Sequence, residues 1–140
     1  MREKVLRQLN AWLPVVLWAF LIFHFSSGRV PVMSTVYWQD FTVKKIGHVL
    51  LFGALALLVY RGLRMNKVSR TKAAIWAVIL ATFYGGTDEF HQMFTQGRES
   101  RVRDVFIDGG GAALVILVAY YLPPKLSKKL YNLVEKFDLV

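Results

Sequence analysis

Four apolar runs, separated by polar segments, divide the chain. They cover about residues 11–27, 44–60, 72–92 and 104–122, lengths close to what a helix needs to cross a bilayer. Pro123 and Pro124 end the last run. The pattern predicts an all-α protein, an integral membrane bundle of four transmembrane helices that forms a single domain over residues 1–140.

The C-terminal tail has a different pattern. Apolar residues recur there at helical spacing with lysines between them, at Leu126, Leu130, Leu133, Val134 and Phe137. This pattern is typical of an amphipathic helix that lies on a membrane surface.

Composition supports the membrane interpretation. The chain is 55% hydrophobic and 19% charged, which is too apolar for an ordinary small soluble domain. The absence of cysteine excludes disulfides, thiolate nucleophiles and cysteine metal sites. A net charge of +9 raises the possibility of nucleic-acid binding, but no nucleic-acid motif accompanies it, so no nucleic-acid partner is expected.

Charge also predicts the orientation of the bundle. The first ten residues, the loop 61–72 and the tail contain 12 basic and 3 acidic residues, whereas segments 28–45 and 88–108 contain six of each. The positive-inside rule then places both termini in the cytoplasm, in a multi-pass protein of the cell membrane.

The first run has an alternative interpretation as a cleaved signal peptide, with Ser26-Ser27-Gly28 as the small residues at a cleavage site. Two tryptophans within the run, Trp12 and Trp18, favour a retained helix.

The predicted topology brings polar residues to the outer membrane face. Lys45 and His48 are three residues apart, Asp88 and Gln92 four, and Asp104 and Asp108 four, so each pair shares one helix face. Ionisable groups at membrane depth usually mark a function. The candidate ligand-binding cluster comprises Lys45, His48, Asp88, Glu89, His91, Gln92, Arg98, Asp104 and Asp108.

Most of these residues also have a structural interpretation. Asp104 is a reasonable N-cap for the fourth run, and the Lys45 side chain can snorkel to the interface. His48 and His91 can be interfacial histidines without a role, and Arg98, Arg101 and Arg103 can be surface charge. Gly109, Gly110 and Gly111 favour close helix packing.

Several segments together resemble the VanZ-like family, named for a teicoplanin-resistance protein. They are Phe25-Ser26-Ser27, Lys45-Ile-Gly-His48, Thr87-Asp88-Glu89-Phe-His91-Gln92, Gly97-Arg98 and Asp104-Val-Phe-Ile-Asp108. Leu51-Phe52 stand where many members have Glu-Tyr. The resemblance implies a small integral membrane protein of the bacterial cell envelope, with a link to glycopeptide and lipoglycopeptide (teicoplanin) resistance in some members.

Two functions of different class follow as hypotheses. The first is a non-enzymatic membrane protein whose outer-leaflet polar pocket binds a lipid headgroup or a lipid-like amphiphile of the cell envelope, with Arg98 and Lys45 contacting its anionic part. The second is a membrane enzyme acting on a lipid-linked or cell-wall substrate, with Asp88 or Glu89 as base, His48 or His91 as acid, and Arg98 stabilising negative charge.

Two further versions remain open at this point. The enzyme could hold a divalent cation between Asp88, Asp104, Asp108 and a histidine. A proton or ion carrier would use the same carboxylate and histidine residues. The binding hypothesis is favoured, and it assigns no catalytic residue, no metal and no cofactor.

Overall fold

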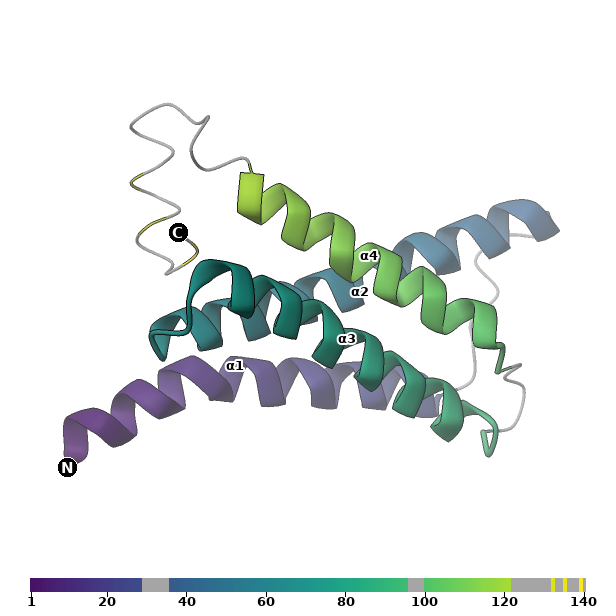
Figure 1. Cartoon of the computed structure of the whole chain (residues 1–140). Coiled ribbons are helices and arrows are strands. Elements are labelled where there is room, and N and C mark those ends of the chain that lie inside the picture. Colours follow the sequence, from purple (N-terminus) through teal and green to yellow (C-terminus); the bar gives the residue numbers. More distant parts are fainter. Residues whose placement is uncertain (29–35, 96–99, 122–131, 133–134, 136–138, 140) are drawn as a thin grey trace.

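A computed structural model describes residues 1–28, 36–95 and 100–121, together with the isolated positions 132, 135 and 139. The described chain forms four α-helices and no strand (Figure 1): α1 is Arg2–Ser27, α2 is Tyr37–Met65, α3 is Arg70–Gln92 and α4 is Val102–Tyr121. The all-α class is therefore confirmed. The expected amphipathic tail falls almost entirely outside the described residues.

The helices extend beyond the apolar runs that predicted them. α1 begins at Arg2 rather than near residue 11, and α2 begins at Tyr37 rather than near residue 44. Residues 37–45, which the pattern placed in a polar segment between two apolar runs, are therefore helical. Polar residues end an apolar run without ending a helix, because lysine and glutamine have good helix propensity when their side chains reach water.

Pro14 lies inside α1 and removes one helical hydrogen bond. The carbonyl that it leaves without a donor belongs to Asn10, four residues earlier. Arg61 on α2 donates to that carbonyl at 3.0 Å and to the Asn10 side-chain oxygen at 3.2 Å. A side chain of α2 thus satisfies the free carbonyl of α1, and these hydrogen bonds hold the two helices together.

The C-terminus of α2 closes with a tight turn. Lys67 has φ 62, and its backbone N–H donates to the carbonyl of Arg64 at 2.9 Å. The N–H of Val68 donates to the carbonyl of Leu63 at 3.1 Å, which completes a Schellman motif. The turn reverses the chain direction within a few residues, so α3 runs back alongside α2.

The core is built around α2, which packs against the three other helices. α1 and α4 lie on opposite sides of the α2–α3 pair (Figure 1). α2 contributes large buried side chains, while α3 presents a stripe of small ones at every fourth position, Ala73, Ala77, Ala81 and Gly85. Small residues let helix backbones approach closely, as in membrane helix pairs.

The backbones of α2 and α4 approach each other closely at Gly111. A Cβ atom placed on Gly111 would lie 2.9 Å from the Cα of Val49 and 3.1 Å from its carbonyl oxygen. No side chain fits there, so Gly111 fixes the separation of the two helices. The same contact places the first turns of α4 beside the first half of α2.

Large apolar side chains cover the outside of the bundle. Phe20, Phe83 and Phe106, on three different helices, are each at least 66% exposed. In the described chain, Arg2–Ser27 and Thr42–Met65 are long and apolar enough to cross a membrane. An apolar surface of this extent is expensive in water and suits contact with lipid.

Candidate functional site

Four carboxylates lie buried at one end of the bundle. Asp88 and Glu89 come from the last turns of α3, and Asp104 and Asp108 from the first turns of α4. Their exposed fractions are 5%, 4%, 7% and 1%. Acidic side chains are rarely this buried unless they are paired, so their partners decide what this end can do.

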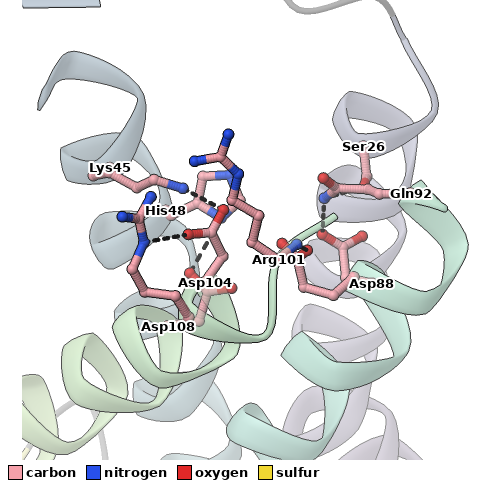
Figure 2. Close-up of polar contacts among 10 residues, drawn as sticks. Ser26, Lys45, His48, Asp88, Gln92, Arg101, Asp104 and Asp108 are labelled. Atoms are coloured by element: carbon pink, nitrogen blue, oxygen red, sulfur yellow. Dashed lines mark hydrogen bonds and ion pairs between the residues drawn. The ribbon is translucent and has the colours of Figure 1, made fainter. Parts of the chain in front are cut away.

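Two of the acids pair with α2 (Figure 2). The Lys45 ammonium forms an ion pair with Asp104, and one turn deeper His48 Nδ1 lies 3.1 Å from Asp108 Oδ1. The three-residue step on α2 matches the four-residue step on α4 because the two helices run in the same direction, so both pairs advance together along them. Helical spacing in the sequence grouped Lys45 with His48 and Asp104 with Asp108. In the structure, the contacts run between the helices instead.

The other two acids receive neutral donors. The Gln92 side-chain amide donates to Asp88 Oδ2 at 2.8 Å and to Ser26 Oγ of α1 at 2.9 Å. Glu89 Oε2 accepts the backbone N–H of Arg101 at 2.9 Å, just before α4 begins. These contacts bring α1, α3 and the start of α4 to the same end as the α2–α4 pairs (Figure 2).

The resulting polar cluster is defined here as Ser26, Lys45, His48, Asp88, Glu89, Gln92, Asp104 and Asp108. One oxygen of each carboxylate in it is buried and receives no hydrogen bond from the described part of the chain: Asp88 Oδ1, Glu89 Oε1, Asp104 Oδ1 and Asp108 Oδ2. Asp104 Oδ1 does lie 3.8 Å from Arg103 Nε, a loose ion pair. The cluster therefore has a surplus of hydrogen-bond acceptors.

The two halves of the cluster are joined through Gly85. A Cβ atom on this residue would lie 3.4 Å from Asp108 Cβ and 3.5 Å from its Oδ2. Asp108 thus packs against α3 one turn before Asp88 and Glu89. Sequence reasoning missed Gly85, although the repeat of small residues at every fourth position of α3 was a signal that could have found it.

His91 lies apart from the acids. Its Nε2 is 3.1 Å from Ser27 Oγ, and its ring centroid is 4.5 Å from that of Phe23. The Ser27 hydroxyl donates to the carbonyl of Phe23 at 2.7 Å, so it accepts a hydrogen bond from His91. The pair links α1 to α3, and it gives Ser27 a partner that the sequence did not reveal.

Two adjacent carboxylates in a partly desolvated place are expected to have a cation partner, and the sequence offers Lys45 or one of the arginines 98, 101 and 103. Within the described part of the chain, ion pairs to the cluster go to Asp104 and Asp108, and Lys45 is paired with Asp104. Arg98, another of these candidates, lies outside the described residues. Asp88 and Glu89 instead receive amide donors.

The metal-dependent hypothesis requires several acidic or histidine side chains that point at one cation. Among the described residues, no three histidine, aspartate or glutamate side chains are arranged to hold a metal ion together. Asp104 and Asp108 are committed to Lys45 and His48, which leaves few ligands for a divalent cation. The arrangement suits a ligand that donates hydrogen bonds.

Comparison with known proteins gives one match. Neither the curated proteins nor the solved structures contain a match to this chain. The family model described as VanZ/LLP1 matches residues 8–123, which include most of α1, the other three helices and the whole polar cluster. The chain therefore belongs to the VanZ/LLP1 family.

Proposed function

We propose that this VanZ/LLP1 protein crosses the cell membrane four times with both termini in the cytoplasm, and that its polar cluster binds the headgroup of a lipid or lipid-like amphiphile in the outer leaflet. The observation that carries the proposal is the gathering of four buried carboxylates, each with an oxygen that lacks a donor, at one end of an apolar bundle.

Energetics support a binding role for this end. A buried polar atom without a hydrogen bond costs about 1–3 kcal/mol, so four such oxygens represent a large cost for a small bundle. Helix packing alone would be served better by apolar side chains in the same places. A ligand that donates hydrogen bonds would recover much of that cost.

The position of the cluster supports an amphiphile rather than a soluble ligand. The cluster lies where α1 and α3 end and α2 and α4 begin, directly beside helices whose outer surfaces carry large apolar side chains. A molecule with a polar head and an acyl chain can contact both surfaces at once. Lipoglycopeptide antibiotics, to which the family resemblance points, belong to this broad chemical class.

Native mass spectrometry of the detergent-solubilised protein tests the proposal. We expect a co-purified lipid in wild type, with occupancy reduced at least tenfold in Asp88→Asn and in Asp104→Asn. Glu3→Gln removes an equal charge from an exposed position in the first turn of α1 and is the matched control. Equal lipid occupancy in all four proteins would mean that lipid binds only the apolar surface, and the proposal would be wrong.

A membrane enzyme is the second candidate, and the His48–Asp108 pair favours it. A carboxylate on Nδ1 orients the imidazole and leaves Nε2 for proton transfer to a substrate, as in general acid–base catalysis. Turnover of a lipid-linked cell-wall precursor by wild type, abolished by His48→Gln and retained by His24→Gln, would support this alternative. Binding without turnover would favour the first proposal.

A further inference from the structure

The charges of the polar cluster are divided unevenly between its two halves. On the α2–α4 side, Asp104 and Asp108 each face a basic side chain, Lys45 and His48. That side contains its own cations and holds two helices in register. It therefore has little capacity to attract a further charged group.

The α3 side is different. Asp88 and Glu89 are adjacent in sequence and both nearly fully buried. Among the described residues, the donors that reach them are two neutral amides, from the Gln92 side chain and the Arg101 backbone. Each acid retains one buried oxygen without a donor, Asp88 Oδ1 and Glu89 Oε1. Ionised carboxylates in such surroundings attract a cation strongly, because little water screens them.

The nearest acid on α4 adds to this negative field. Asp108 Oδ2 also lacks a donor and lies against the Gly85 position of α3, one turn before Asp88. Three acceptor oxygens from three acids thus border the α3 side. The complementary group carries a positive charge and several N–H donors, which describes a primary ammonium group.

We propose that Asp88 and Glu89 bind the primary ammonium group of an amphiphile headgroup. The inference rests on the proposed function and specifies the chemistry of its ligand: a headgroup that bears an amine, rather than one recognised through phosphate alone. It also departs from the expectation that Lys45, together with Arg98, contacts the anionic part of the ligand, since Lys45 is paired with Asp104.

Entry of an ammonium group requires a side chain to move, because the unpaired oxygens are covered by neighbouring atoms. Gln92 is suited to this exchange. Its amide nitrogen spans Ser26 and Asp88, and an ammonium group donates the same kind of hydrogen bond to the same oxygens with the addition of charge. After the exchange, Ser26 Oγ and Asp88 Oδ2 still have a donor, and a further N–H of the ammonium group is available for an oxygen that lacked one.

The test compares lipids that share a phosphate and differ in the amine. Purified full-length protein is titrated by native mass spectrometry with phosphatidylethanolamine, its N,N-dimethyl derivative, phosphatidylcholine and phosphatidylglycerol, all with the same acyl chains. We expect wild type to bind phosphatidylethanolamine at least tenfold more tightly than phosphatidylcholine, with the dimethyl lipid between them. Soluble phosphoethanolamine, added as a competitor, shows whether the headgroup alone suffices.

The variants assign the preference to the acid pair. Asp88→Asn and Glu89→Gln, which preserve size, should each remove the preference for the amine, whereas Glu3→Gln should retain it. If one variant does not fold, the other variant and the wild-type lipid series still decide the question.

The outcomes separate this inference from the proposed function. Equal binding of all four lipids at the cluster, or a preference for phosphatidylglycerol, would refute ammonium recognition and leave headgroup binding intact. Absence of binding by every lipid would refute both. Preference for the amine that survives Asp88→Asn and Glu89→Gln would place recognition elsewhere.

Discussion

His48 on α2 and Asp108 on α4 form a partly buried pair, with Nδ1 and Oδ1 3.1 Å apart, the His48 side chain 20% exposed and that of Asp108 1% exposed. Phe52, one turn further along α2, stacks against the His48 ring at a centroid distance of 6.1 Å and is itself buried. Phe52 therefore packs against the face of the His48 ring, and the Asp108 carboxylate contacts its edge at Nδ1. This pair fixes the register of α2 against α4 at the depth where Gly111 allows them to touch.

The first prediction concerns the energy of this pair. His48→Leu leaves both oxygens of a buried acid without a donor, whereas Asp108→Asn keeps an acceptor for the imidazole. We expect a coupling energy of about 1–3 kcal/mol in the double-mutant cycle of the two changes. Unfolding titrations with SDS in mixed micelles measure the four free energies.

The matched control for this cycle is His24→Leu, at an exposed position of α1. Its effect should add to that of Asp108→Asn within about 0.5 kcal/mol. Additive effects of His48→Leu and Asp108→Asn would show that the carboxylate of Asp108 is no stronger a partner for His48 than an amide, and the prediction would be wrong.

Much of this fold follows from the hydrophobic pattern. A long apolar run that lacks the alternation of apolar and polar residues typical of a strand indicates a helix. The pattern could not give the helix ends. Arg2 and Tyr37 begin helices within polar segments, and the start of α2 is marked by neither a side-chain cap nor a change in hydropathy. A helix end is defined by where the main-chain hydrogen bonds stop, and the amino-acid composition around it determines that position only weakly.

The candidate site, too, could be predicted only in part from the sequence. Helical spacing put Asp104 with Asp108 and Lys45 with His48, since intervals of three and four residues share a face. It could not choose partners across helices, because that choice depends on the depth at which α2 and α4 meet. Gly111 sets that depth through a contact with Val49, 62 positions earlier in the chain, which no local pattern contains.

The second prediction tests the close approach of α2 and α4. A methyl group at Gly111 would clash with the backbone of Val49, so Gly111→Ala should lower the free energy of unfolding by about 1–3 kcal/mol. At Gly110 nothing lies within 4 Å of an added Cβ atom, and Gly110→Ala should raise it by about 0.5–1 kcal/mol through helix propensity. The same SDS titration measures both.

These two glycines are neighbours in one helix, so each controls for the other. Equal destabilisation by both substitutions would indicate a general intolerance of α4 to side chains. Equal stabilisation would mean that the helices are further apart than the structure has them.

The third prediction uses the turn after α2. Lys67 adopts a left-handed conformation with φ 62, which costs a residue with a Cβ atom roughly 1–2 kcal/mol. Lys67→Gly removes that cost, but glycine also gives the unfolded chain more conformational entropy, which offsets part of the gain. The free energy of unfolding should therefore rise by about 0.5–1 kcal/mol. Thermal unfolding in detergent provides the measurement.

Lys67→Ala separates the backbone effect from the loss of charge. Alanine keeps the Cβ atom, so this variant should gain nothing. A gain of equal size in Lys67→Ala and Lys67→Gly would trace the effect to the lysine charge rather than to the left-handed turn.

The last prediction is the topology. The chain contains no cysteine, so a single introduced thiol reports its own position without background. Ser69 and Met93 flank α3 and are both exposed. If α3 spans the membrane and the basic loop 61–72 is cytoplasmic, a membrane-impermeant maleimide should label Met93→Cys in intact cells and should label Ser69→Cys only after lysis. The charge difference of 12 basic against 3 acidic residues on the cytoplasmic side supports this direction. Labelling of Ser69→Cys alone in intact cells would invert the orientation and move the polar cluster to the inner leaflet. Labelling of both would mean that α3 does not separate two compartments, and an outer-leaflet ligand could then no longer be assigned to Asp88 and Glu89.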